Sequence, residues 1–225
     1  MGKFVRERCC TSFAEVKEAR ENGADRVELC EDLSCGGVTP SADLVRECCA
    51  LPIKVHVLIR ARGGDFVYTS EELETMKESI RQSLEAGAAG VVIGALTAEG
   101  DVDIPAMKAL MEVAHNSNRK MSVTFHRAFD CCRDQFSALE DIVALGCDRI
   151  LTSGGEPSAL EGKERLAQLV SRSGGRIIIL AAGAVDETQL EILSKETGAV
   201  EFHGTRLSST NSFMLAKLEL WVFLT

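Results

Sequence analysis

The chain has 225 residues, of which 45% are apolar, enough to fill the core of one large α/β domain. Its 25 basic and 34 acidic side chains give a formal net charge of -9, which argues against a phosphate-backbone binder and favours a protein that handles small ligands. Nucleic acid is therefore not an expected partner. The first ten residues lack the apolar run of a signal peptide, and the apolar stretch at 213–225 is shorter than the roughly 20 residues of a bilayer span. We expect no membrane partner.

The nine cysteines indicate a reducing compartment. Their number is odd, their spacing is uneven, and three pairs are adjacent in the sequence, as in Cys9-Cys10. Structural disulfides in secreted proteins form more regular frameworks. A cytoplasmic protein with free thiols is the expectation.

Eight strand-like apolar runs alternate with helical patterns along the chain. The runs occupy 3–10, 23–29, 53–60, 87–93, 121–126, 146–151, 176–180 and 198–202. Helical stretches such as 70–87 and 134–146 lie between them, with apolar residues at three- and four-residue spacing. Gly23, Gly87, Gly146 and Gly198 each stand where a helix should end.

This alternation predicts parallel strands joined by helical crossovers. An open doubly wound sheet would satisfy it too, but no Gly-x-Gly-x-x-Gly follows the first strand and eight regular units favour closure. We therefore predict a TIM-like (β/α)8 barrel as a single domain over 1–206. The atypical tail at 207–225 is predicted to form a divergent or shortened C-terminal helix.

Ligands of such barrels bind at the carboxyl ends of the strands, where this sequence places its unusual residues. Side chains alternate between the two faces of a strand, so the apolar positions of the run VELC should face the helices and turn Glu28 and Cys30 inward. The same alternation places further candidates inside the barrel: Glu7, Cys9, Thr124, His126, Glu201 and His203. Thiols, carboxylates and imidazole are thus expected to converge on one side of the lumen.

His126, Arg127 and Asp130 form a second group of candidates within one loop. A buried charged trio indicates either an ion-pair network or a catalytic site, and a satisfied interior histidine is the plainer interpretation of His126. Likewise, Cys9 or Cys30 taken alone is more often a small buried filler than a ligand.

Arg60, Arg62 and Asp65 surround two glycines in a loop that is free to approach an anion. Paired arginines suit a carboxylate or phosphate, although Asp65 could occupy one of them. The loop of Ser153, Gly154 and Gly155 offers backbone N–H groups where many barrels hold phosphate.

Seven motifs, in order from about residue 5 to 206, carry a family resemblance. They are GADRVELC, GGVTPS, IRARGGDFVY, GALTAEGDVD, VTFHRAFD, RILTSGG and EFH. Together they resemble the signatures of the CutC copper-homeostasis family. The resemblance implies a cytoplasmic, self-associating TIM-like barrel that is linked to copper handling and proposed to bind Cu(I) through cysteines. It assigns no enzymatic reaction.

The family's paired Glu-x-Cys motifs match this sequence at Glu7 with Cys9 and at Glu28 with Cys30. Its histidine cluster matches at His126, Arg127 and Asp130. The sequence departs from the family in three places. Arg6 and Arg8 stand where apolar residues are usual, and AGA replaces three glycines after the seventh strand. The tail differs throughout.

Two functions follow as hypotheses. The first is a copper homeostasis protein that binds Cu(I) through Cys9 and Cys30, with help from His203. The second is an enzyme for a small phosphorylated or carboxylated metabolite, with an arginine as anchor and with His126 and Glu28 or Glu7 as acid and base.

Overall fold

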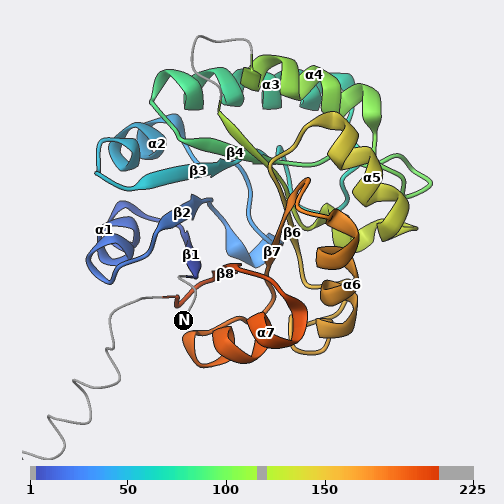
Figure 1. Ribbon diagram of the computed structural model, residues 1–225. Helices are drawn as coiled ribbons and strands as arrows, with labels where there is room; N and C mark the ends of the chain where they lie inside the picture. The colour runs from blue at the N-terminus through green and yellow to red at the C-terminus, as the bar shows by residue number, and fades with distance from the viewer. Residues whose placement is uncertain (1–3, 116–120, 208–225) are drawn as a thin grey trace, which may run out of the picture.

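The computed structural model describes residues 4–115 and 121–207, and its eight parallel strands close into one barrel (Figure 1). Each strand pairs with the next, and β8 pairs with β1. The strands are β1 (Val5–Cys10), β2 (Arg26–Leu29), β3 (Lys54–Leu58), β4 (Gly90–Ile93), β5 (Ser122–Phe125), β6 (Arg149–Thr152), β7 (Ile178–Ala181) and β8 (Glu201–Gly204). The predicted TIM-like (β/α)8 fold is confirmed.

Seven α-helices surround the barrel in the described part of the chain. They are α1 (Phe13–Glu21), α2 (Ala42–Cys49), α3 (Ser70–Glu85), α4 (Ile104–His115), α5 (Gln135–Leu145), α6 (Lys163–Ser173) and α7 (Leu190–Thr197). Short 3-10 turns occur at η1 (Leu33–Cys35), η2 (Arg127–Cys131) and η3 (Glu187–Gln189). A terminal helix was predicted for the tail at 207–225, of which all but Leu207 lies outside the described residues.

Local sequence signals fix where the helices begin and end. Thr69 caps α3 in a reciprocal capping box with Glu72, and Asp134 caps α5 by accepting from two backbone N–H groups. The four glycines predicted to follow helices all have positive φ, for example +83° at Gly146. This conformation favours glycine and turns the chain into the next strand.

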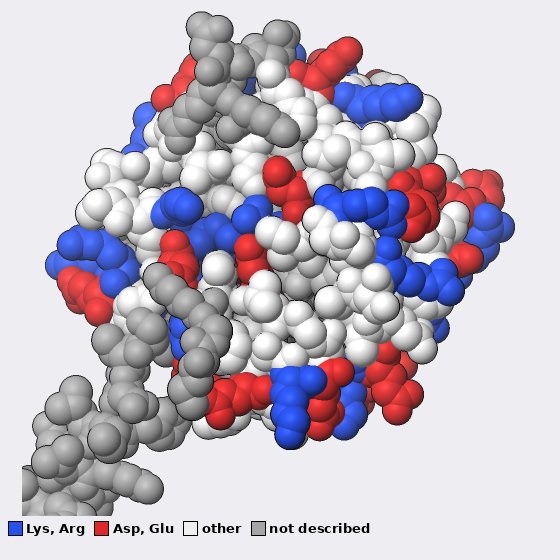
Figure 2. Space-filling model, in the orientation of Figure 1, with Lys and Arg blue, Asp and Glu red and all other residues white. Residues whose placement is uncertain are grey.

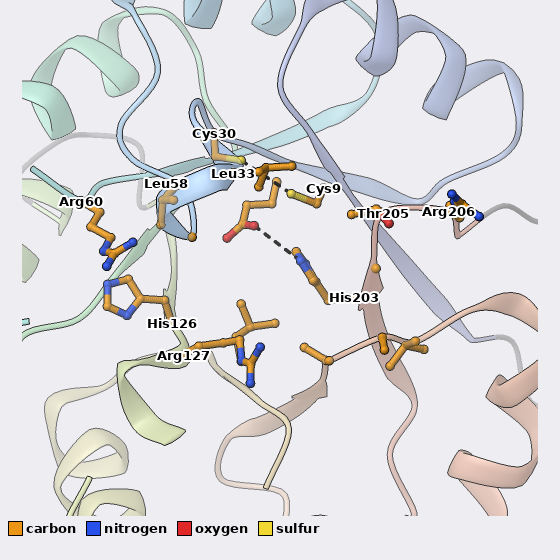
Figure 3. A pocket seen from close by; sticks show the side chains of 18 of the residues that line it. Cys9, Cys30, Leu33, Leu58, Arg60, His126, Arg127, His203, Thr205 and Arg206 are labelled. Atoms are coloured by element: carbon orange, nitrogen blue, oxygen red, sulfur yellow. Dashed lines mark hydrogen bonds and ion pairs between the residues drawn. The ribbon is translucent and has the colours of Figure 1, made fainter. Parts of the chain in front are cut away.

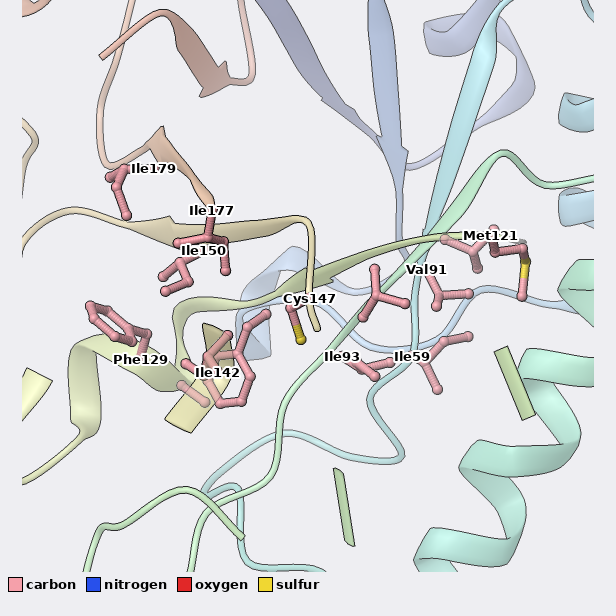
Figure 4. Close-up of a cluster of buried hydrophobic side chains, with 14 of the residues drawn as sticks. Ile59, Val91, Ile93, Met121, Phe129, Ile142, Cys147, Ile150, Ile177 and Ile179 are labelled. Atoms are coloured by element: carbon pink, nitrogen blue, oxygen red, sulfur yellow. The ribbon is translucent and has the colours of Figure 1, made fainter. Parts of the chain in front are cut away.

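The main hydrophobic core lies between the strands and the helices (Figure 4). Ile93 from β4, Ile150 from β6 and Ile142 from α5 are fully buried there. Val27 and Leu29 also belong to this core, as strand alternation predicted, which leaves Glu28 and Cys30 on the inside of the barrel.

The two arginines that depart from the family pattern in β1 find partners in the helical layer. Arg6 pairs with Glu187 at 2.5 Å, and Arg8 pairs with Glu18 at 3.1 Å. These ion pairs compensate the charges, and the strand pairs in register with β2 and β8.

The surface seen in Figure 2 carries both signs of charge side by side, without a broad area of one sign among the described residues drawn there. Within residues 4–115 and 121–207, no helix has the length and apolar character required to cross a membrane.

Candidate functional site

A cavity of about 560 Å³ opens among the carboxyl ends of the strands (Figure 3). Residues from β1, β2, β3, β8 and the loop after β2 line one side, where Leu58 of β3 packs with Cys9 and Cys30. Residues from the loops after β3, β5 and β7, with Leu151 of β6, line the other. The lining includes Cys9, Glu28, Cys30, Leu33, Leu58, Arg60, Phe66, His126, Arg127, Leu151, Ala182, Gly183, His203 and Arg206. This is the end of the barrel at which the sequence predicted ligands.

The thiols of Cys9 and Cys30 lie together on one wall of the cavity. Their Sγ atoms are 3.6 Å apart, and both residues are buried. Cys9 stands opposite Glu28 in the β1–β2 register, and Cys30 follows directly after β2. Ligand atoms of Cys9, Glu28 and His203 all lie within 4.8 Å of one another. The predicted convergence of thiols, carboxylate and imidazole is present.

Hydrogen bonding holds His203 against this cluster. Its Nδ1 lies 2.8 Å from Glu7 Oε1, and its Nε2 lies 3.6 Å from Glu28 Oε2. Burial acts to lower the pKa of His203, but Glu28, Cys9 and Glu7 outweigh it and hold that pKa well above its usual value. The imidazole is therefore protonated and oriented by carboxylates in the metal-free protein.

Their surroundings disfavour charge on two other members of the cluster, Cys9 and Glu28. The contact with Cys30, followed by burial, raises the pKa of the Cys9 thiol far above its usual value. Burial raises the pKa of Glu28 as well, against the opposing attraction of His203. A metal ion would have to displace the Cys9 proton on binding, since thiolate sulfur is the ligand.

An ion-pair network lies beneath the cavity and supports Glu7. The Arg26 guanidinium donates to Glu7 and, at 2.8 Å, to Glu201, which also accepts from Arg149 at 2.8 Å. Burial acts to raise the pKa of Glu7, but Arg26 and His203 together lower it, so this carboxylate is ionised. Glu7 and Glu201 thus support the site from below and do not line the cavity.

The sequence prediction missed Arg26 and Arg149. Arg26 stands two positions before Glu28 in the same strand, so the alternation that turned Glu28 inward turns Arg26 inward too. Arg149 has the same relation to Leu151, which lines the cavity from β6. The alternation of side chains along each strand was the signal that could have identified Arg26 and Arg149 as inward-facing residues.

His126 lies on the wall opposite the thiols. It is buried, and its Nδ1 accepts from the Ala128 N–H at 3.2 Å. Burial, with a smaller effect of Arg60, lowers the pKa of His126 to about 3. The ring is therefore neutral near pH 7 and suits hydrogen bonding better than proton transfer.

Asp130 and its neighbours have a mainly local role. Its carboxylate accepts from Arg127 Nε at 2.7 Å and from the N–H groups of Ser153 and Gly155 at 3.1 to 3.2 Å. Gly154 donates its N–H to Thr152 Oγ1 at 2.8 Å. The amides expected to cradle a phosphate are thus already bound by side chains of the protein itself.

The arginines of the loop after β3 occupy two different environments. Arg60 is buried and lines the cavity, and its Nη atoms donate to the carbonyls of Cys35, Gly37 and Gly64 at 2.7 to 2.9 Å. Arg62 pairs with Asp65 at 2.9 Å and with Glu72 at 2.6 Å on the outer surface. Arg62 and Asp65 do not reach the cavity.

Comparison with known proteins identifies the family. A model of the CutC family matches residues 4–208, a range that contains the whole described barrel. The chain belongs to the CutC family. Among relatives, the CutC protein of Parabacteroides distasonis is 45% identical over 219 residues, covering 96% of this chain and 87% of the relative. The CutC protein of Vibrio vulnificus is 43% identical over 209 residues, covering 92% and 83% respectively.

Solved structures agree with this assignment. The proposed copper homeostasis protein CutC of Streptococcus agalactiae superposes with a TM-score of 0.85 and 33% identity, covering 90% of this chain and 99% of that one. A protein described as the aldolase QR15 superposes with a TM-score of 0.66 at 19% identity, covering 98% and 96%. At that identity the second likeness shows the shared fold alone.

Proposed function

We propose that this CutC-family chain acts in copper homeostasis by binding Cu(I) through the thiolates of Cys9 and Cys30. The observation that supports this most directly is the 3.6 Å separation of the two buried Sγ atoms at an open cavity. Soft thiolate ligands favour Cu(I) over harder cations. The similar CutC protein of Streptococcus agalactiae, which is described as a proposed copper homeostasis protein, also supports this function.

His203 is the proposed third ligand. Its Nε2 faces the group formed with Cys9 and Glu28, while its Nδ1 is held by Glu7. A carboxylate partner on the second ring nitrogen is the usual support of a metal-binding histidine. Copper binding would displace protons from Cys9 and His203, because only the deprotonated forms are ligands.

A competition titration against a Cu(I) chelator tests the proposal. We expect the reduced wild-type protein to withdraw one equivalent of Cu(I), and the Cys9→Ser/Cys30→Ser variant to lose this ability. Cys131→Ser is the matched control, because that cysteine is exposed and does not line the cavity. Unchanged Cu(I) binding by the double variant would exclude the two thiols as ligands.

The family resemblance also supports a cytoplasmic location and self-association. Light scattering coupled to size-exclusion chromatography tests the second of these, and we expect a mass that is a multiple of the 24.3 kDa chain. A mass equal to one chain at micromolar concentration contradicts it.

A further inference from the structure

The cavity is much larger than a metal ion requires. Its volume of about 560 Å³ falls within the range of roughly 300–1,000 Å³ found for small-molecule sites, whereas one water occupies about 30 Å³. The thiols and His203 occupy only the side formed by β1, β2 and β8. The opposite side, formed by Arg60, Phe66 and the loop after β5, is left with space for an organic molecule.

Arg60 on that opposite side is a buried cation without a carboxylate partner among the described residues. It is 6% exposed, its Nη atoms donate to three backbone carbonyls, and its guanidinium lies 4.9 Å from the centre of the Phe66 ring. Its Nε is buried without an acceptor in the described chain. Buried charges in proteins are normally paired, so an anion is the missing partner.

His126 adds a second unsatisfied donor beside Arg60 (Figure 3). Because Nδ1 accepts from the Ala128 N–H, the neutral ring carries its hydrogen on Nε2. That Nε2 is buried and has no acceptor in the described part of the chain. The low pKa of about 3, which burial and then Arg60 produce, keeps the ring in this neutral form. Buried donors are usually satisfied, which indicates an absent acceptor group.

We propose that the cavity binds a small organic carboxylate, which pairs with the Arg60 guanidinium beside the His126 ring and whose body lies against Phe66 and Leu151. Arg60 Nε and His126 Nε2 are both covered in the free protein, so the two side chains must shift to donate to the carboxylate. Two donors and one positive charge with no carboxylate in ion-pair contact among the described residues match a carboxylate. A phosphate fits less well, since the amides of Ser153 and Gly155 that would serve it are bound by Asp130. This site is separate from the copper ligands and requires no metal.

Calorimetry on the reduced, metal-free protein tests the proposal with defined probes. The probes are hexanoate, benzoate and phenylacetate, each compared with its primary amide, and phenyl phosphate. We expect at least one carboxylate to bind about tenfold more tightly than its amide and to shift the side-chain ¹⁵N resonance of His126. If no carboxylate binds, if the amides bind equally well, or if phenyl phosphate binds most tightly, the proposal is wrong.

Variants then locate the site. His126→Phe keeps a ring over Gly94 but removes the donor, and we expect about tenfold weaker carboxylate binding with the melting temperature recorded as a check of folding. Arg62→Met removes a nearby arginine that does not reach the cavity, and it should bind normally. Cys9→Ser/Cys30→Ser should also bind carboxylate normally, which separates this proposal from the copper proposal. Wild-type affinity in His126→Phe would overturn the assignment.

Discussion

Replacing Arg26 by Met tests the ion-pair network that supports the site. The substitution removes the buried guanidinium between Glu7 and Glu201, whose side chains are only 1% and 8% exposed. Removing one partner of a buried pair typically destabilises a protein by about 3–5 kcal/mol. His203 still contacts Glu7 and Arg149 still contacts Glu201, so we expect the lower end of that range, about 3 kcal/mol.

For a chain of this size, a loss of about 3 kcal/mol corresponds to a fall in melting temperature of roughly 6–12 °C. Urea unfolding of the reduced, metal-free protein measures the free energy directly. Arg46→Met is the matched control, because Arg46 pairs with Asp43 on the surface with 61% and 86% of the side chains exposed. Its expected effect is within about 0.5 kcal/mol.

A second variant separates loss of charge compensation from loss of packing. In Glu7→Gln/Arg26→Met the uncompensated carboxylate is gone. We therefore expect the double variant to lose less free energy of unfolding than the sum of the losses in Glu7→Gln and Arg26→Met. Strict additivity, or a loss in Arg26→Met no greater than in Arg46→Met, would refute the stabilising role of the network.

Three further outcomes are expected. Since the pKa of the Cys9 thiol is raised, the thiol must lose its proton when copper binds. The loss of this proton alone should increase the Cu(I) affinity about tenfold per pH unit. A Cu(I) affinity that does not change with pH in competition titrations contradicts this. Gly162→Ala should lower the free energy of unfolding in urea by about 3 kcal/mol, because a Cβ would lie 1.8 Å from the Ser153 carbonyl oxygen. Gly146→Ala, which has open space but a φ of +83°, should lower it by only about 1 kcal/mol. Equal losses in the two variants contradict the clash. Asp130→Asn should cost about 1.5–3 kcal/mol and speed hydrogen exchange at the Ser153 N–H, and unchanged exchange contradicts its anchoring role.

Much of the fold could be predicted from periodicity and helix-ending glycines, because both act within short stretches of chain. Gly146 ends α5 in the predicted left-handed conformation, and β6 follows as expected. Strand alternation likewise placed Glu28 and Cys30 inside the barrel, since the two faces of a strand are fixed by backbone geometry.

The partners of side chains in loops could not be predicted in the same way. Asp130 binds the amides after β6, and Arg60 binds carbonyls from two separate loops, so both roles depend on how distant segments fold together. Arg62 was grouped with Arg60 because they are two residues apart, yet it turns outward to Asp65 and Glu72. Sequence proximity in a loop does not determine the direction of a side chain.

Copper K-edge X-ray absorption of protein loaded with one equivalent of Cu(I) tests the central claim most directly. The two thiolates and His203 predict a first shell of two sulfurs and one nitrogen. The sulfur scattering should disappear in Cys9→Ser/Cys30→Ser and persist in Cys131→Ser. A first shell of only nitrogen and oxygen in the wild-type protein would contradict Cu(I) binding by Cys9 and Cys30.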